Sequence, residues 1–147
     1  MKVAELGRKH RRIGIDSNVV IYALEGSGPE SHAARAVFDL MAAGACSGVL
    51  SILGVIEILV GPARHAADAL VQRYADELME LEGLEVVGIE HETAIEAAHV
   101  RASGVGLADA IHLASARTFG ASAFVTNDLR LKALRGLDVV SLPELLS

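Results

Sequence analysis

Short aliphatic segments alternate with helical segments along most of the chain, and this order limits the possible folds more than any other feature. Apolar runs bounded by turn residues predict strands at residues 12–16, 47–52, 84–89, 123–126 and 138–140. Helical spacing predicts helices at residues 17–24, 29–43, 53–60, 63–81, 92–101 and 107–119. Because strands separated by helices need crossover connections, we expect an α/β fold with a mostly parallel sheet covered on both faces.

Length and composition favour one globular domain. The chain has 147 residues, 52% of them hydrophobic and only 3% aromatic, a size that suits one aliphatic core and is short for two domains. We assign residues 12–147 to this single domain and residues 1–11 to a basic N-terminal tail. The apolar runs end well before the roughly 18 residues that span a membrane, and no export signal is evident, so we expect a cytoplasmic protein.

The net charge of −6 argues at first against a polyanionic partner. The objection weakens when four isolated acids are assigned to a metal site, because the remaining side chains are then nearly neutral overall. The start of the chain carries a basic tract that could contact phosphates, namely Lys2, Arg8, Lys9, Arg11 and Arg12, with His10 among them. A solvated and partly disordered tail is the interpretation that we favour.

Four acids interrupt apolar stretches in which a charge is hard to explain, and they are Asp16, Glu57, Asp109 and Asp128. Asp16 ends the first predicted strand, and Asp109 lies near the start of an apolar helix. Glu57 is the only Asp, Glu, Lys or Arg between Gly48 and Ala63. The fourth acid follows the strand AFVTN directly. Each acid therefore needs a neutralising partner.

Burial of an unpaired carboxylate is costly, so proteins neutralise it, pair it or bind it to a metal. A helix cap or salt bridge would explain any single acid, and Asp128 has Arg130 close in sequence. One shared Mg²⁺ or Mn²⁺ would explain all four, with Asp16 and Asp109 as the most direct ligands and Glu57 as the acid hardest to explain otherwise. Such a cluster suits hydrolysis of a phosphodiester by metal-activated water.

His112 lies one helical turn after Asp109 and shares its face of the predicted helix. It could serve as a metal ligand or as a proton shuttle. Because a hard cation favours oxygen ligands, we instead assign His112 to a supporting position beside the acids.

Four segments resemble, in order, the signature regions of PIN-domain ribonucleases, in particular VapC-like toxins of toxin–antitoxin pairs, and they read IGIDSNVVIYAL, SILGVIEILVGP, LADAIHLASA and FVTNDLRL. The resemblance carries the family's acids over to the four named above and its small hydroxyl residue to Ser17. Its site-lining amides match Asn18 and Asn127 more loosely. The basic tail is a departure, because such domains often begin almost at the first strand.

The resemblance implies a three-layer α/β/α sandwich, Mg²⁺- or Mn²⁺-dependent endoribonuclease activity on RNA, a homodimer and inhibition by a cognate antitoxin. Two alternatives stay open. A DNA-directed metal nuclease would use the same acids, because nothing in the sequence reads a 2′-hydroxyl. A non-catalytic binding module of the same fold is the other alternative. The intact set of acids speaks against it, because a site that has lost its activity has no reason to keep isolated charges among aliphatic residues.

Overall fold

The central layer of the molecule is a parallel sheet. The computed structural model describes residues 1–146, and the strands in this part of the chain are β1 (Arg12–Ile15), β2 (Ser47–Ser51), β3 (Leu84–Val87), β4 (Ala123–Thr126) and β5 (Asp138–Ser141). They pair in the order β3-β2-β1-β4-β5, and every neighbouring pair is parallel. The carboxyl end of β1 therefore lies between those of β2 and β4.

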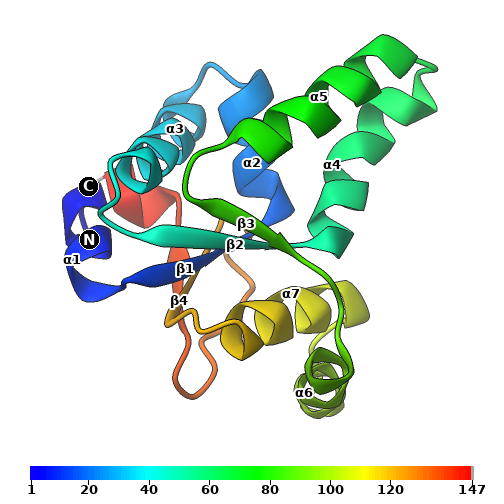
Figure 1. The fold of residues 1–147 in the computed structure, drawn as a ribbon. Coiled ribbons are helices and arrows are strands. Elements are labelled where there is room, and N and C mark those ends of the chain that lie inside the picture. The colour runs from blue at the N-terminus through cyan, green and yellow to red at the C-terminus, as the bar shows by residue number, and fades with distance from the viewer. Residues whose placement is uncertain (147) are drawn as a thin grey trace.

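Helices cover both faces of this sheet. They are α1 (Val3–Lys9), α2 (Ser17–Glu25), α3 (Pro29–Ala42), α4 (Ile52–Arg64), α5 (Asp68–Glu80), α6 (His91–Ala102), α7 (Leu107–Thr118) and the 3-10 helix η1 (Pro143–Leu146). Figure 1 shows α2 and α3 on one side of the sheet and α6 and α7 on the other, with α4 and α5 packed together beside α2. The predicted α/β/α sandwich with a parallel sheet is confirmed. Within residues 1–146, no helix combines the length and apolar character that crossing a membrane requires.

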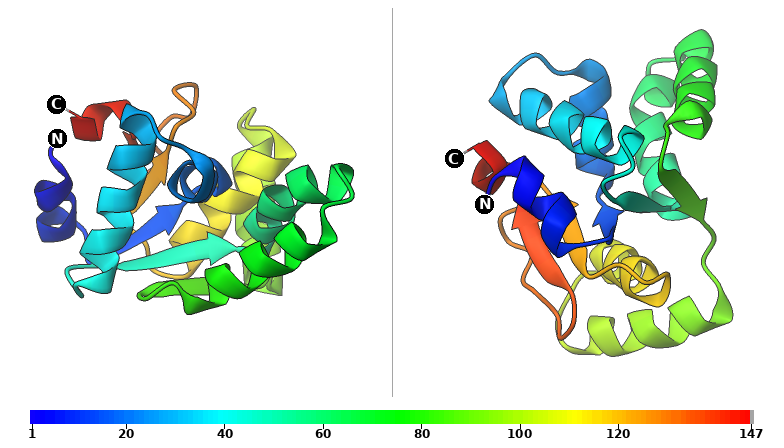
Figure 2. Two further views of the ribbon diagram at one scale, coloured as in Figure 1. Left: turned by 90° about the horizontal axis from the view of Figure 1, so that it is seen from above. Right: turned by 60° about the vertical axis from the view of Figure 1, so that its left-hand side comes forward.

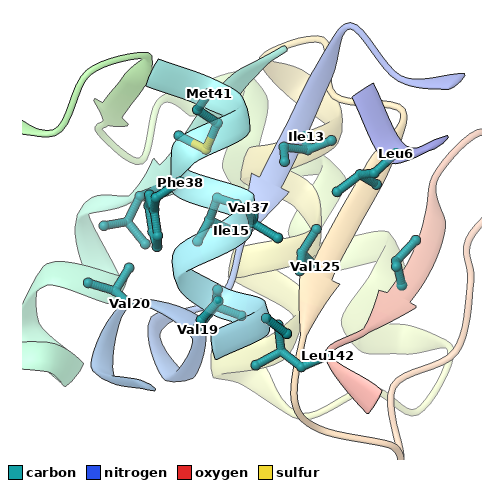
Figure 3. Packing of buried hydrophobic residues seen from close by; sticks show 14 of the residues in the cluster. Leu6, Ile13, Ile15, Val19, Val20, Val37, Phe38, Met41, Val125 and Leu142 are labelled. Carbon is teal, nitrogen blue, oxygen red and sulfur yellow. The ribbon is translucent and has the colours of Figure 1, made fainter. Parts of the chain in front are cut away.

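The larger hydrophobic core lies between the sheet and the layer formed by α2 and α3 (Figure 3). Alternate residues of a strand face opposite sides, so Ile13 and Ile15 of β1 both point into this core, where they join Val37 and Met41 of α3. Each such buried side chain contributes roughly 1.5–3 kcal/mol relative to an exposed one. This packing holds α2, which begins directly after β1, against the sheet.

On the opposite face, α7 approaches β1 at Gly14. A Cβ atom at this position would lie 2.5 Å from Cβ of Ala116 and 2.7 Å from Cδ1 of Phe124, closer than real Cβ atoms come. A second close approach occurs in α4, where a Cβ at Gly54 would lie 2.6 Å from Cδ1 of Leu50 on β2. Both helices therefore come this near to their neighbours because a side chain is missing.

The chain between β2 and β3 differs from the prediction of one helix that ends before Pro62 and a second at residues 63–81. Instead, α4 includes Pro62 and ends at Arg64, and a turn precedes α5. Ala66 in this turn has a φ of 53°, a left-handed conformation that stops the helix. Pro62 has no N–H to donate to the carbonyl of Ile58, and α4 continues for only two residues beyond it. The single helix at 63–81 is therefore wrong.

Residues 1–11, for which we favoured a solvated and partly disordered tail, instead contain α1. Leu6 is fully buried in the larger core, and α1 packs against α3. Figure 2 shows α1 and the C-terminal η1 next to each other. In the basic tract, Lys2, Arg8, Lys9 and Arg11 are exposed, whereas Arg12 is half-buried and His10 is buried. Leu6, with the half-buried Met1 and Val3, therefore holds against the core a segment whose composition suggests disorder.

Candidate metal centre

The carboxyl ends of β1, β2 and β4 bring the predicted acids to one edge of the sheet. Asp16 directly follows β1, and Asp128 lies just beyond β4. Glu57 lies in α4, which starts where β2 ends (Figure 1), and Asp109 lies in the first turn of α7. The N–H of Asp16 donates to the carbonyl of Val125 at 3.0 Å, which extends the pairing with β4 and fixes the position of Asp16.

Asp16 is buried, at 6% exposure, and its hydrogen bonds come from neutral groups. Thr126 Oγ1 donates to its Oδ2 at 2.7 Å, and Asn18 Nδ2 donates to the same oxygen at 3.3 Å. Ser17 Oγ lies 3.4 Å from Oδ1. No lysine or arginine of residues 1–146 forms an ion pair with Asp16. Its negative charge is therefore not paired with a lysine or an arginine.

Thr126 links two of the acids and was not predicted from the sequence. Its side chain is fully buried, and its hydroxyl donates to Asp16 while it accepts the N–H of Asp128 at 3.0 Å. A hydroxyl can do both at once because it carries one donor and two acceptor lone pairs. The signal in the sequence was a hydroxyl residue at the end of an otherwise aliphatic strand, directly before Asn127 and Asp128.

Glu57 has two hydrogen-bond partners. Nε2 of His112 donates to its Oε1, and Ser17 Oγ donates to the same oxygen at 2.9 Å. His112 is 3% exposed. One ligand atom from each of Asp16, Glu57 and His112 can be chosen so that all three lie within 4.8 Å of one another. The structure thus gathers two of the predicted acids and the predicted supporting histidine into one cluster.

The electrostatics of this cluster explain how Glu57 is accommodated. The hydrogen bond from His112 holds the pKa of Glu57 below its ordinary value, against the opposing effect of burial. Burial acts to lower the pKa of His112, but the hydrogen bond to Glu57 and the charges of the neighbouring acids together raise it. Glu57 was the acid that we found hardest to explain without a metal, and the structure gives it His112 as a hydrogen-bond partner, whose raised pKa favours the protonated form.

Asp109 and Asp128 differ in how their charge is balanced. Burial, followed by the charges of Asp16 and Asp128, raises the pKa of Asp109, so these carboxylates repel one another. Hydrogen bonds from Arg130 instead hold the pKa of Asp128 below its ordinary value. Nε of Arg130 donates to Oδ1 of Asp128 at 3.0 Å, and Nη2 donates to Oδ2 at 2.9 Å. Asp128 is therefore paired with the neighbour that the sequence offered.

The two predicted amides have different contacts. Asn18 contacts Asp16 through Nδ2 and accepts the N–H of Asn127 through Oδ1 at 3.0 Å. The side chain of Asn127 donates to the hydroxyl of Tyr22 at 3.2 Å. Asn18 thus orients an acid directly, whereas Asn127 ties the segment after β4 to α2.

The donor set of this edge fits a divalent hard cation. Asp16 and Glu57 supply carboxylate oxygens within reach of one ion, and Mg²⁺ and Mn²⁺ prefer such ligands. Among the described residues, Asp109 and Asp128 do not belong to this group, although the charges of Asp16 and Asp128 act on Asp109. The repulsion that raises the pKa of Asp109 marks an excess of negative charge, and a cation would relieve it. An acidic cluster suited to a divalent metal is therefore present.

A cleft of about 620 Å³ lies beside Asp109 and Asp128. One wall is the turn between α6 and α7 at residues 103–106, and the other is the segment at residues 130–134. The basic side chains in its lining are Arg130 and Lys132. Acids and bases thus share one groove, which suits an elongated anionic ligand that also contacts a metal.

The sequence matches the PIN domain family over residues 13–137. Three solved structures share the fold. VapBC2 from Rickettsia felis, bound to a DNA fragment from its promoter, aligns with a TM-score of 0.71 at 16% identity and covers 88% of this chain and 98% of that one. DNA-bound VapBC from Salmonella typhimurium aligns with a TM-score of 0.69 at 20% identity, covering 89% and 98%. A toxin–antitoxin complex from Klebsiella pneumoniae aligns with a TM-score of 0.63 at 20% identity, covering 85% and 94%.

No curated protein sequence matches the chain significantly. The solved structures, at their low identity, establish the fold, and the family match spans most of the sequence. The chain therefore belongs to the PIN domain family.

Proposed function

We propose that this chain is a metal-dependent endoribonuclease, which hydrolyses RNA phosphodiester bonds and acts in the cytoplasm as the toxin of a toxin–antitoxin pair. The observation that carries the proposal is the carboxylate of Asp16 in a PIN fold, which is buried and forms no ion pair with a lysine or arginine of residues 1–146. Its charge also helps to raise the pKa of Asp109. Clusters of this kind suit phosphoryl chemistry, which needs a metal more than it needs a protein nucleophile.

Four acids would hold Mg²⁺ or Mn²⁺, namely Asp16, Glu57, Asp109 and Asp128. A bound metal of this kind polarises the phosphate and lowers the pKa of the attacking water. The charge of the acids would attract the metal, and the basic lining of the adjoining cleft would attract the RNA backbone.

The remaining site residues orient these acids. Thr126 and Asn18 hold Oδ2 of Asp16, which limits the directions that its carboxylate can face. Ser17 and His112 hold Oε1 of Glu57 in the same way. Oriented carboxylates bind a metal without a large loss of side-chain entropy, so these neutral and cationic partners support affinity without touching the substrate.

Cleavage of matched RNA and DNA oligonucleotides with Mg²⁺, Mn²⁺ or EDTA tests the proposal. We expect RNA cleavage with either metal, none with EDTA, and none by Asp16→Asn, which should remain folded by circular dichroism. Asp68→Asn makes the same change at an exposed acid of α5 and should cleave normally. Preferential cleavage of DNA would instead identify a DNA-directed nuclease, and RNA binding without cleavage under any condition would identify a binding module.

The proposal includes a homodimer and an inhibitory antitoxin. Ile52, Ile56 and Val60 recur every fourth residue of α4 and are 41%, 60% and 38% exposed, so they form an apolar row that suits a protein partner. The solved structures that share the fold are described as VapBC or toxin–antitoxin complexes. Light scattering should give the mass of a dimer, and expression should arrest growth unless the adjoining gene is co-expressed. A monomeric mass, or growth without arrest, would contradict these two parts.

A further inference from the structure

Arg130 covers Asp128 beside the cleft. Its guanidinium donates to both carboxylate oxygens, at 3.0 and 2.9 Å. The side chain of Arg130 is nevertheless 88% exposed, whereas that of Asp128 is 20% exposed. Exposed ion pairs stabilise a fold little, because water solvates the separated charges well. The guanidinium can therefore be exchanged for another partner at low cost.

The local turn does not depend on this guanidinium. The backbone N–H of Arg130 donates to Oδ1 of Asp128 at 2.9 Å, and the N–H of Asp128 donates to Thr126 Oγ1 at 3.0 Å. Neither bond uses the side chain at position 130, so both would form with any non-proline residue there. The side chain of Arg130 is thus available for a second contact.

The surroundings of Arg130 indicate what that contact is. Arg130 lines the cleft together with Asp109 and Lys132, and its charge also acts on Asp109. It therefore lies where an anionic strand would pass the acids. A planar guanidinium binds a phosphate with the same two-pronged geometry that it uses on a carboxylate.

We propose that Arg130 binds a phosphate of the RNA strand and leaves Asp128 as it does so, which couples RNA binding to metal binding. The inference rests on the proposed function. Without RNA, the guanidinium competes with the metal for the oxygens of Asp128. With RNA, the phosphate removes that competitor, and linkage requires that the metal strengthens RNA binding by the same factor. The complete metal site then forms mainly when a substrate is present.

The test uses Arg130→Gln, which removes the charge and the two-pronged donor. Arg135→Gln is the matched control, because Arg135 is exposed, does not line the cleft and forms no ion pair within residues 1–146. Calorimetry would measure Mn²⁺ binding to the RNA-free proteins. Fluorescence anisotropy would measure binding of a labelled RNA oligonucleotide in EDTA, where no metal-dependent cleavage occurs.

We expect the two affinities of Arg130→Gln to change in opposite directions. Mn²⁺ should bind several-fold more tightly without RNA, because a competitor has gone, while RNA in EDTA should bind about tenfold more weakly. Arg135→Gln should change each affinity by less than about twofold, because solvent screens its charge. Arg130→Lys keeps a point charge and should bind RNA with intermediate affinity.

A fall in both affinities, no change in either one, or equal effects of Arg135→Gln would overturn the proposal, because each outcome assigns Arg130 a structural or nonspecific role. Failure of the proposed function is seen separately, as absence of RNA cleavage by the unmodified protein with Mg²⁺ and Mn²⁺. If that protein cleaves RNA and Arg130→Gln lacks the opposite changes, the nuclease assignment stands and the coupling is wrong.

Discussion

Two of the acids have a cationic partner, and the two pairs differ in their surroundings. Glu57 of α4 pairs with His112 of α7, whose side chain is 2% exposed, so this pair joins two helices inside the fold. Asp128 pairs with Arg130, two residues further along an exposed segment. The two pairs differ in the burial of the base, because the side chains of the acids that remain after loss of His112 or Arg130 are 36% and 20% exposed. A buried base is held in place by the packing around it, whereas an exposed base can turn to another partner. The site thus has a fixed side and an exchangeable side, with Asp16 between them.

Removal of the buried partner should have the largest effect. His112→Gln replaces a group that is readily protonated with a neutral amide and weakens the support of Glu57. We expect RNA cleavage to fall about 10- to 100-fold. The free energy of unfolding, measured with urea, should fall by about 2 kcal/mol, the usual contribution of a hydrogen bond to a charged group. His99→Gln on α6 is an exposed control. Normal cleavage and stability of His112→Gln would contradict the claim that His112 is a fixed partner on which Glu57 depends.

Thr126→Val tests the group that connects the two sides. Valine keeps the branched shape but cannot donate to Asp16 or accept from the N–H of Asp128. The free energy of unfolding should fall by about 1–2 kcal/mol, because buried polar groups lose their partner, and Mn²⁺ should bind more weakly. Thr126→Ser retains the hydroxyl and should resemble the unmodified protein. If the valine variant binds Mn²⁺ normally, the hydroxyl does not position Asp16.

Asp109→Asn should stabilise the metal-free protein to a smaller extent. In the fold, the pKa of Asp109 is raised above its ordinary value of 3.8, so stability is lost as the pH rises through this range. The variant lacks that penalty and should unfold at a higher temperature at neutral pH, with the advantage disappearing below about pH 3.8. Asp68→Asn is the control. With Mg²⁺ added, the unmodified protein should unfold at the higher temperature, because the variant has lost a metal ligand. If Asp109→Asn remains the more stable protein in Mg²⁺, Asp109 is not a ligand.

Arg130→Gln should have the smallest effect on stability. Its side chain is exposed and the main-chain bonds of the turn remain, so its unfolding midpoint should match that of Arg135→Gln. Differential scanning calorimetry in EDTA would make the comparison. A clear fall in the unfolding midpoint would show that Arg130 stabilises the fold as His112 does, and the contrast between a fixed and an exchangeable partner would be wrong.

Much of the fold follows from local patterns in the sequence. The short aliphatic runs before Asp16 and Asp128 became β1 and β4, and the parallel sheet then brought those acids together. Two errors have physical causes. A proline within a helical pattern usually ends the helix before it, but here α4 includes Pro62 and ends two residues later at Arg64. The segment before β1 is basic and has few apolar residues, namely Met1, Val3, Ala4 and Leu6, so it is too short for a periodic pattern to predict α1.

The candidate site was predictable where it carries charge in an apolar setting, and less so where it depends on neutral groups or on side-chain direction. The site acids were identified as isolated charges in apolar runs, and Thr126 was missed because it is uncharged. His112 counts as neutral in a sequence, and only its contact with Glu57 shows how it can become cationic. Arg130 was recognised as a partner for Asp128, but its exposure and its place in the cleft appear only in three dimensions.

The absence of a side chain at Gly14 allows α7 to lie close to β1. A methyl group there would overlap Ala116, so α7 would have to move away from β1 and would carry Asp109 and His112 away from Asp16. Catalytic groups tolerate displacements of only about 0.5 Å. The small size of Gly14 therefore fixes the distance between α7 and β1 at which the acids of both elements could share a metal.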